Sequence, residues 1–122
     1  MCRVNFAENQ LNGLIMKRVG SVIGVNMSKL DEYKRLHADV WPKVIDMIKQ
    51  CNIRNYSIYY MNGMLYSYYE YTGDDYEKDM SKMAADPVTQ EWWKLCNPCQ
   101  IPVPARKPGE WWAEMEEVFH CD

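Results

Sequence analysis

The sequence predicts an α+β domain in which helices cover one face of an antiparallel sheet. The predicted elements follow the order strand, helix, strand, strand, helix, strand, and a tight Asn62-Gly63 turn joins the two middle strands. With 122 residues, the chain has the length of one ordinary domain. This order is that of the ferredoxin-like split βαβ arrangement, whose sheet keeps one face open. We expect two such sheets to meet in a dimeric α/β barrel-type assembly.

The first strand is predicted over residues 19–25, after the charged pair Lys17-Arg18. Residues 1–16 match neither a strand nor a helix pattern, and they lack the apolar stretch of a signal peptide. We therefore expect an amino-terminal tail there, and a translation start at Met16 would place this tail upstream of the true start.

A helix is predicted next, beginning at Ser28, whose hydroxyl would cap the first free amides. Apolar and aromatic side chains then recur at helical spacing. Pro42 lacks an amide donor, which predicts a kink or restart near residues 40–41. The helix is expected to end by residues 50–51.

A hairpin follows, with strands at 54–60 and 64–71 that are rich in Tyr, Ile and Leu. Alternation in the first strand places Tyr56, Ile58 and Tyr60 on one face and Ser57 and Tyr59 on the other.

The second helical region is predicted in two pieces. Asp74 or Asp75 would cap a helix that runs to about residue 85, and Asp86-Pro87 would then restart it, because Asp at the cap and Pro at the first helical position are a favoured order. The second piece is expected to end near Cys96.

A loop rich in proline follows, and the final segment is ambiguous. Residues 113–117 have helical propensity, whereas residues 118–120 favour a strand. The predicted order of elements requires a strand in this segment.

The net charge, the aromatic content and the cysteine content of the chain exclude some classes of function and favour others. Seventeen acidic residues against fourteen basic residues give a net charge of −3, which argues against a nucleic-acid or anionic-membrane surface. Nine Tyr and five Trp, against two Phe, favour a partly polar aromatic pocket or a dimer interface. Five cysteines without an evident framework indicate reduced thiols in a cytoplasmic protein. The longest uncharged stretch, residues 55–69, is too rich in Tyr and Ser for a membrane helix.

His37 is the candidate catalytic residue. It lies four residues after Tyr33, so both side chains project from one helical face, and an imidazole donates and accepts protons near neutral pH. Spacing alone favours a core histidine satisfied by a neighbour.

Two tryptophan pairs and two cysteines are further candidates for a functional role. Trp92-Trp93 lies on a helix where adjacent side chains diverge, so one indole would pack while the other lines a cavity. Trp111-Trp112 favours packing or an interface. Cys96 and Cys99 have the spacing of a redox motif but enter a loop, and the chain shows no set of metal ligands or phosphate loop.

Five short motifs, in order and at compatible spacing, resemble the L-rhamnose mutarotase family. They are Tyr33-Lys34-Arg35-Leu36-His37, Trp41-Pro42, Asn55-Tyr56-Ser57-Ile58-Tyr59, Gln90-Glu91-Trp92-Trp93-Lys94 and Glu117-Val118-Phe119. The resemblance covers residues 17–120, and it implies a mutarotase-like domain over residues 17–122. It implies a homodimer that interconverts the α and β anomers of a 6-deoxy monosaccharide without a metal or organic cofactor.

By the same resemblance, His37 corresponds to the proton donor, and Tyr33, Tyr56, Trp92 and Trp93 correspond to substrate-binding positions. The segment 97–112 departs from the family's best-known members, which keeps L-fucose, or another 6-deoxy or pentose sugar, open as the substrate. Two rival functions are a ferredoxin-like monooxygenase, which needs a larger and more apolar pocket, and a non-catalytic dimer that binds a small ligand.

Overall fold

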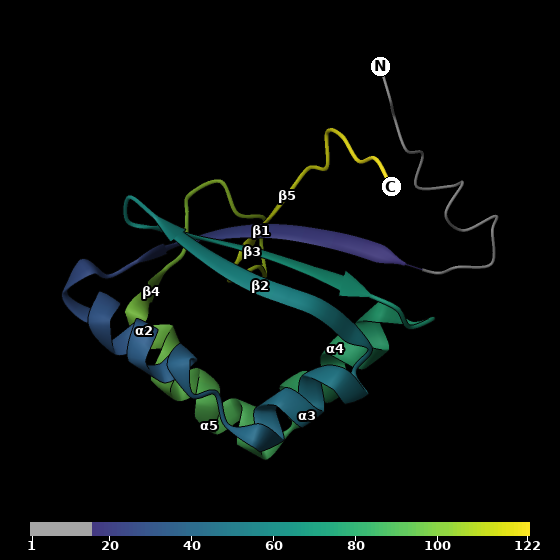
Figure 1. Cartoon of the computed structure of the whole chain (residues 1–122), viewed down its shortest axis with the longest axis horizontal. Helices are drawn as coiled ribbons and strands as arrows, with labels where there is room; N and C mark the ends of the chain where they lie inside the picture. The colour runs from purple at the N-terminus through teal and green to yellow at the C-terminus, as the bar shows by residue number, and fades with distance from the viewer. Residues whose placement is uncertain (1–15) are drawn as a thin grey trace.

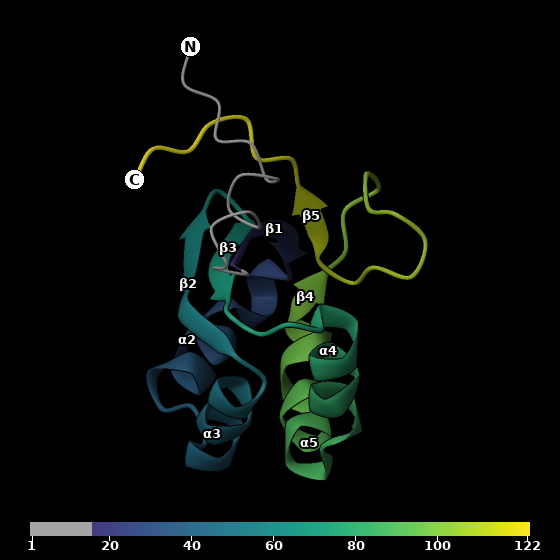
Figure 2. The same ribbon diagram turned by 90° about the vertical axis from the view of Figure 1, so that its right-hand side faces the viewer.

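The computed structural model describes residues 16–122, so the predicted tail lies outside the described residues apart from Met16. The helices of this range all lie on one side of a sheet (Figure 1), in two columns that stand side by side (Figure 2). The predicted α+β, ferredoxin-like order is confirmed. In chain order the elements are β1 (Lys17–Val25), the 3₁₀ turn η1 (Met27–Lys29), α2 (Leu30–Ala38), α3 (Pro42–Gln50), β2 (Ile53–Met61), β3 (Met64–Tyr71), α4 (Tyr76–Ala85), α5 (Pro87–Cys96), the 3₁₀ turn η2 (Asn97–Cys99), β4 (Gln100–Ile101) and β5 (Ala113–Met115).

The sheet is antiparallel, with the strand order β2-β3-β1-β4, and β5 also pairs with β1. The last strand of the expected order is therefore divided in two. Its first part lies beside Gly24 and its second beside Ser21, and residues 102–112 loop out between them. Gly24 permits the close approach, because a Cβ atom there would lie 2.8 Å from the carbonyl oxygen of Ile101.

The hairpin of β2 and β3 is confirmed. Asn62 and Gly63 both have positive φ, 50° and 79°, as a two-residue hairpin turn requires. Ile58 and Tyr60 pack against the core while Tyr59 is 65% exposed, so the predicted faces are also confirmed.

Both helix restarts occur where proline predicts them. α3 begins at Pro42 and α5 at Pro87, and the side chains of Asp75 and Asp86 cap α4 and α5. The prediction that Ser28 caps the first helix was wrong. Asn26 follows β1 directly, and its side-chain oxygen accepts hydrogen bonds from the amide and hydroxyl of Ser28, which lies inside η1.

The end of the chain contains the strand that the predicted order requires, but not at the residues with the strand propensity. Residues 113–115 form a strand where the sequence favours a helix, because the free edge of β1 offers backbone partners that outweigh a small intrinsic propensity. Residues 118–120, which favour a strand, have no regular structure, and Val118 is 82% exposed. The proline-rich segment also contains β4, which was predicted as loop.

The core lies between the sheet and the helices. It joins β1 and β3 to α2, α3 and α5, and its buried members are Ile23, Val25, Tyr33, Leu36, Val44, Leu65, Trp92, Cys96 and Cys99. Across residues 16–122, the helices are all too short or too polar to span a bilayer.

Candidate active site

His37 is held on α2 by Tyr33, one helical turn earlier. Its Nδ1 atom lies 2.9 Å from the Tyr33 carbonyl oxygen, and its ring stacks on the Tyr33 ring with centroids 4.2 Å apart. A carbonyl oxygen only accepts hydrogen bonds, so Nδ1 carries a proton. The neutral imidazole therefore presents the lone pair of Nε2 as a proton acceptor.

Burial lowers the pKa of His37 below its ordinary value of 6.5, against the opposing effect of the bond to the Tyr33 carbonyl. The imidazole is consequently neutral at pH 7. Such a group is well placed to accept a proton and return it, which is the chemistry of a general acid–base catalyst.

Tyr33 and His37 line a cavity of about 280 Å³ between α2 and the β2–β3 hairpin. This volume lies just below the range of about 300–1,000 Å³ that is typical of small-molecule sites, so it suits a small ligand better than a polycyclic one. The other lining residues are Leu30, Lys34, Ala38, Ile58, Tyr59, Tyr60 and Leu65. Tyr56, Trp92 and Trp93 are not among them.

The two indoles of the Trp92-Trp93 pair diverge. Trp92 is 6% exposed and contacts the rings of His37 and Trp41 edge-on, at centroid distances of 5.4 Å and 5.3 Å. Trp93 is 37% exposed. The structure thus brings Trp92 to His37, and it leaves Trp93 at the surface of α5.

Tyr56 belongs to a group of tyrosines between the sheet and the helices. Its ring lies 5.4 Å from that of Tyr69, whose hydroxyl bonds to that of Tyr76. Tyr56 is 43% exposed as a residue, but its hydroxyl lies on the buried side, which raises its pKa to about 12; the pKa of Tyr33 and of Tyr69 is raised by burial as well. A charge on Tyr56 would raise both further, so these hydroxyls lie within electrostatic reach of one another and stay neutral.

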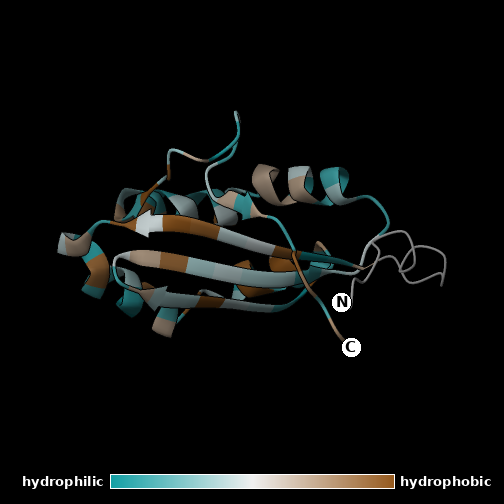
Figure 3. Ribbon diagram, turned by 90° about the horizontal axis from the view of Figure 1, so that it is seen from above, coloured by the Kyte–Doolittle hydropathy of each residue, from teal (hydrophilic) through white to brown (hydrophobic). Residues whose placement is uncertain are grey.

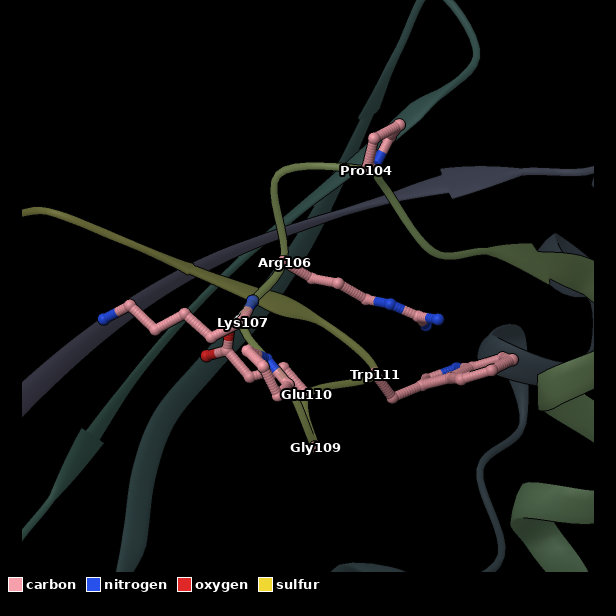
Figure 4. A pocket seen from close by; sticks show the side chains of 7 residues that line it. Pro104, Arg106, Lys107, Gly109, Glu110 and Trp111 are labelled. Atoms are coloured by element: carbon pink, nitrogen blue, oxygen red, sulfur yellow. Dashed lines mark hydrogen bonds between the residues drawn. The ribbon is translucent and has the colours of Figure 1, made fainter.

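Two residues that sequence reasoning did not select reach the site from the far end of the chain. The side chain of Gln100, on β4, bonds to the Tyr33 hydroxyl and to the indole of Trp111. Trp111 also lines a second hollow, of about 520 Å³, formed by the loop of residues 102–112 (Figure 4). Gln100 and Tyr33 are 67 positions apart, so no local sequence pattern indicates that their side chains meet.

Cys96 and Cys99 are buried free thiols. Burial raises the pKa of Cys96 to about 12, which favours the unreactive thiol form. Within residues 16–122, no three His, Cys, Asp or Glu side chains are grouped as a metal site would require.

Comparisons with known proteins bear on this site. A family model for L-rhamnose mutarotase matches residues 18–121. The chain is 35% identical over 109 residues to the L-rhamnose mutarotases of Oceanobacillus iheyensis and Bacillus subtilis, covering 88% of this chain and all of each relative.

Among solved structures, an L-rhamnose mutarotase from Formosa agariphila superposes with a TM-score of 0.67 at 20% identity, over 87% of this chain and 99% of that one. Tetracenomycin F2 cyclase from Streptomyces glaucescens gives a TM-score of 0.62 at 11% identity, over 87% and 99% of the two chains, a likeness of fold alone. The family match over residues 18–121 and the 35% identities show that this chain belongs to the L-rhamnose mutarotase family.

Proposed function

We propose that this chain interconverts the α and β anomers of L-rhamnose, the reaction named by its family, with His37 as the acid–base residue. The observation that carries the proposal is the placement of His37 at a cavity of about 280 Å³, with Nδ1 bound to a carbonyl and Nε2 left to exchange protons. The cavity size favours a monosaccharide over the larger substrates of the rival monooxygenase reading.

The proposed reaction uses one imidazole in two steps. Nε2 of neutral His37 accepts the proton of the anomeric hydroxyl, and the C1–O5 bond of the pyranose breaks as the C1 carbonyl forms. The imidazolium then donates the same proton to O5, which gives the open-chain sugar. Rotation about C1–C2 and the reverse steps form the other anomer, so that His37 accepts and then donates one proton in ring opening and again in ring closure.

The remaining predicted site residues would bind the sugar, Tyr33 from within the cavity and the others where the sugar extends beyond the cavity lining. Tyr33 and Tyr56 carry neutral hydroxyls that exchange hydrogen bonds with sugar hydroxyls. An indole of Trp92 or Trp93 would offer an apolar face to the ring or to the C6 methyl group. L-Fucose presents the same groups with different hydroxyl orientations, so it is the natural comparison substrate.

Saturation-transfer NMR between the α and β anomeric signals tests the proposal. Wild-type protein should transfer saturation in L-rhamnose more effectively than in L-fucose, and His37→Ala should slow the exchange by about 10² to 10⁴. The chain's other histidine supplies the control, because His120→Ala should leave the rate unchanged. Sugar binding without transfer would instead favour the non-catalytic module, and normal exchange in His37→Ala would remove His37 from the mechanism.

The pH profile provides a second test of His37. Because burial lowers its pKa, the catalytically competent neutral form persists below pH 6.5 and is lost as pH falls through the lowered value. The exchange rate should therefore be flat around pH 7 and decline on the acid side with one ionisation. A rate that rises on acidification would mean that the protonated form starts the reaction.

We also propose that the chain is a cytoplasmic homodimer. The face of the sheet away from the helices (Figure 3) carries Tyr59, Met61 and Tyr66, each at least 39% exposed, and such an apolar patch favours a partner. A second copy would present the same patch, as two-fold symmetry requires. Sedimentation should show a dimer that Tyr66→Glu converts to monomer, whereas a monomeric wild type would contradict the assembly.

A further inference from the structure

Gln100 connects the loop of residues 102–112 to the candidate site. Gln100 is only 9% exposed. Its Nε2 group donates a hydrogen bond to the Tyr33 hydroxyl at 3.3 Å, and its Oε1 atom accepts one from Nε1 of Trp111 at 2.8 Å. Figure 4 shows the Trp111 indole reaching out of the loop on the side opposite to Lys107. The side-chain amide is thus fixed at both of its ends.

The chemistry of the indole decides how this amide is oriented. An indole N–H group only donates hydrogen bonds, so the amide must turn its oxygen toward Trp111. Its NH₂ group then faces Tyr33, whose hydroxyl oxygen becomes the acceptor. The proton of the Tyr33 hydroxyl is left to be donated in another direction.

That proton has no acceptor within the protein as described. Tyr33 is 3% exposed, and among residues 16–122 no hydrogen bond has its hydroxyl as the donor. A buried hydroxyl proton without an acceptor is costly unless a ligand or water supplies one. Because Tyr33 lines the cavity next to His37, the bound ligand is the available acceptor.

We propose that Gln100 and Trp111 are positioning residues that make Tyr33 a hydrogen-bond donor to an oxygen of the sugar. The loop of residues 102–112 thereby takes part in substrate recognition through Trp111. The proposal rests on the proposed function, since it assigns the ligand of Tyr33 as the monosaccharide. It concerns binding, so the expected effect is on KM.

Gln100→Glu is the sharpest substitution, because it keeps the shape of the side chain and replaces its NH₂ donor by an acceptor. Tyr33 would then donate its proton to the new carboxylate and present only lone pairs to the sugar. We expect KM for L-rhamnose to rise about tenfold, with kcat changed less than about threefold. Gln50→Glu, at an exposed position on α3, controls for the added charge.

Trp111→Phe removes the indole donor without burying a charge, which keeps the proposal testable where the Glu variant does not fold. The freed amide would adopt both orientations, so KM should rise less, by about two- to threefold. An unchanged KM in both variants would overturn the proposal.

A double-mutant cycle separates positioning from general damage to the structure. In a Tyr33→Phe background the hydroxyl is absent, so Gln100→Glu should have almost no further effect on KM. A penalty that persists in that background would overturn the proposal, because it would mean that Gln100 acts without Tyr33.

Failure of the proposed function is distinguishable from failure of this inference. If wild-type protein exchanges neither L-rhamnose nor L-fucose, the proposed function fails. NMR of the free protein then tests the arrangement itself: the side-chain NH₂ protons of Gln100 should show NOEs to the Tyr33 ring that weaken in Trp111→Phe. Their absence in the wild type would overturn the inference, whatever the activity.

Discussion

The two helical columns are each broken by a proline, but their second helices begin differently. α5 begins after Asp86, whose carboxylate accepts hydrogen bonds from the amide and hydroxyl of Thr89 at 2.9 Å and 2.8 Å. α3 begins after Trp41, which makes no side-chain capping bond. A polar cap contributes about 1 kcal/mol, which α3 forgoes.

The residue that replaces the cap explains the difference. The Trp41 ring lies edge-on to Trp92 at 5.3 Å, and Trp92 in turn contacts His37 at 5.4 Å. The break between α2 and α3 thus supports the candidate site, whereas the break between α4 and α5 serves the stability of the helix. The same local feature, a proline that follows an extended residue, therefore has a different role in each of the two helical columns.

The largest expected effect is that of Trp41→Ala. Loss of a half-buried indole should lower the free energy of unfolding by about 2–4 kcal/mol, and the loss of support for Trp92 should slow anomer exchange in the folded protein. Chemical denaturation and saturation-transfer NMR measure the two effects.

Trp41→Asp is the matched variant, because it supplies the missing cap. It should be about 1 kcal/mol more stable than Trp41→Ala, with exchange equally slow. Full exchange in either folded variant would show that the first break is merely structural.

Asp86→Ala should have an intermediate effect that is confined to stability. The amide of buried Thr89 loses its acceptor, so unfolding should become easier by about 1–2 kcal/mol, while exchange per folded molecule stays unchanged. Asp86→Asn, which retains an acceptor, should recover most of the loss. If fully folded Asp86→Ala exchanged anomers more slowly than the wild type, the break between α4 and α5 would also support the site, and the two breaks would not differ in role.

Proline replacement should have the smallest effect. Pro42→Ala and Pro87→Ala should each cost about 0.5–1 kcal/mol, because the unfolded chain gains freedom. Pro42→Ala should also slow exchange slightly, since it releases the restriction that proline places on the backbone of Trp41. Equal exchange rates in the two variants would argue against this coupling.

The parts of the fold that the sequence predicted depend on local chemistry. Pro42, Asp86-Pro87 and Asn62-Gly63 each determine the backbone within a few residues, and all three positions were predicted. The strand at residues 113–115 depends on a free edge of β1, which no local pattern reveals. Its pairing overrode a helical propensity of a few tenths of a kcal/mol per residue.

The candidate site divides in the same way. Tyr33 and His37 share a helical face, so their proximity follows from spacing alone. Gln100 contacts Tyr33 from 67 positions away, because η2 and the pairing of β4 with β1 carry the chain from the end of α5 back to the sheet. Gln100 and Trp111 lie in a proline-rich segment whose sequence pattern does not predict a contact with Tyr33.

The divided last strand has an evolutionary consequence. Residues 102–112 leave the sheet beside Gly24 and return beside Val22, so both ends of the excursion are anchored to neighbouring positions of one strand. Doubling the length of such a loop costs only about 0.6 kcal/mol in closure entropy. Insertions and deletions there would leave the sheet intact while moving Trp111. The loop of residues 102–112 can therefore change in length during evolution without loss of the fold, and homologous proteins would differ in sugar preference through this loop.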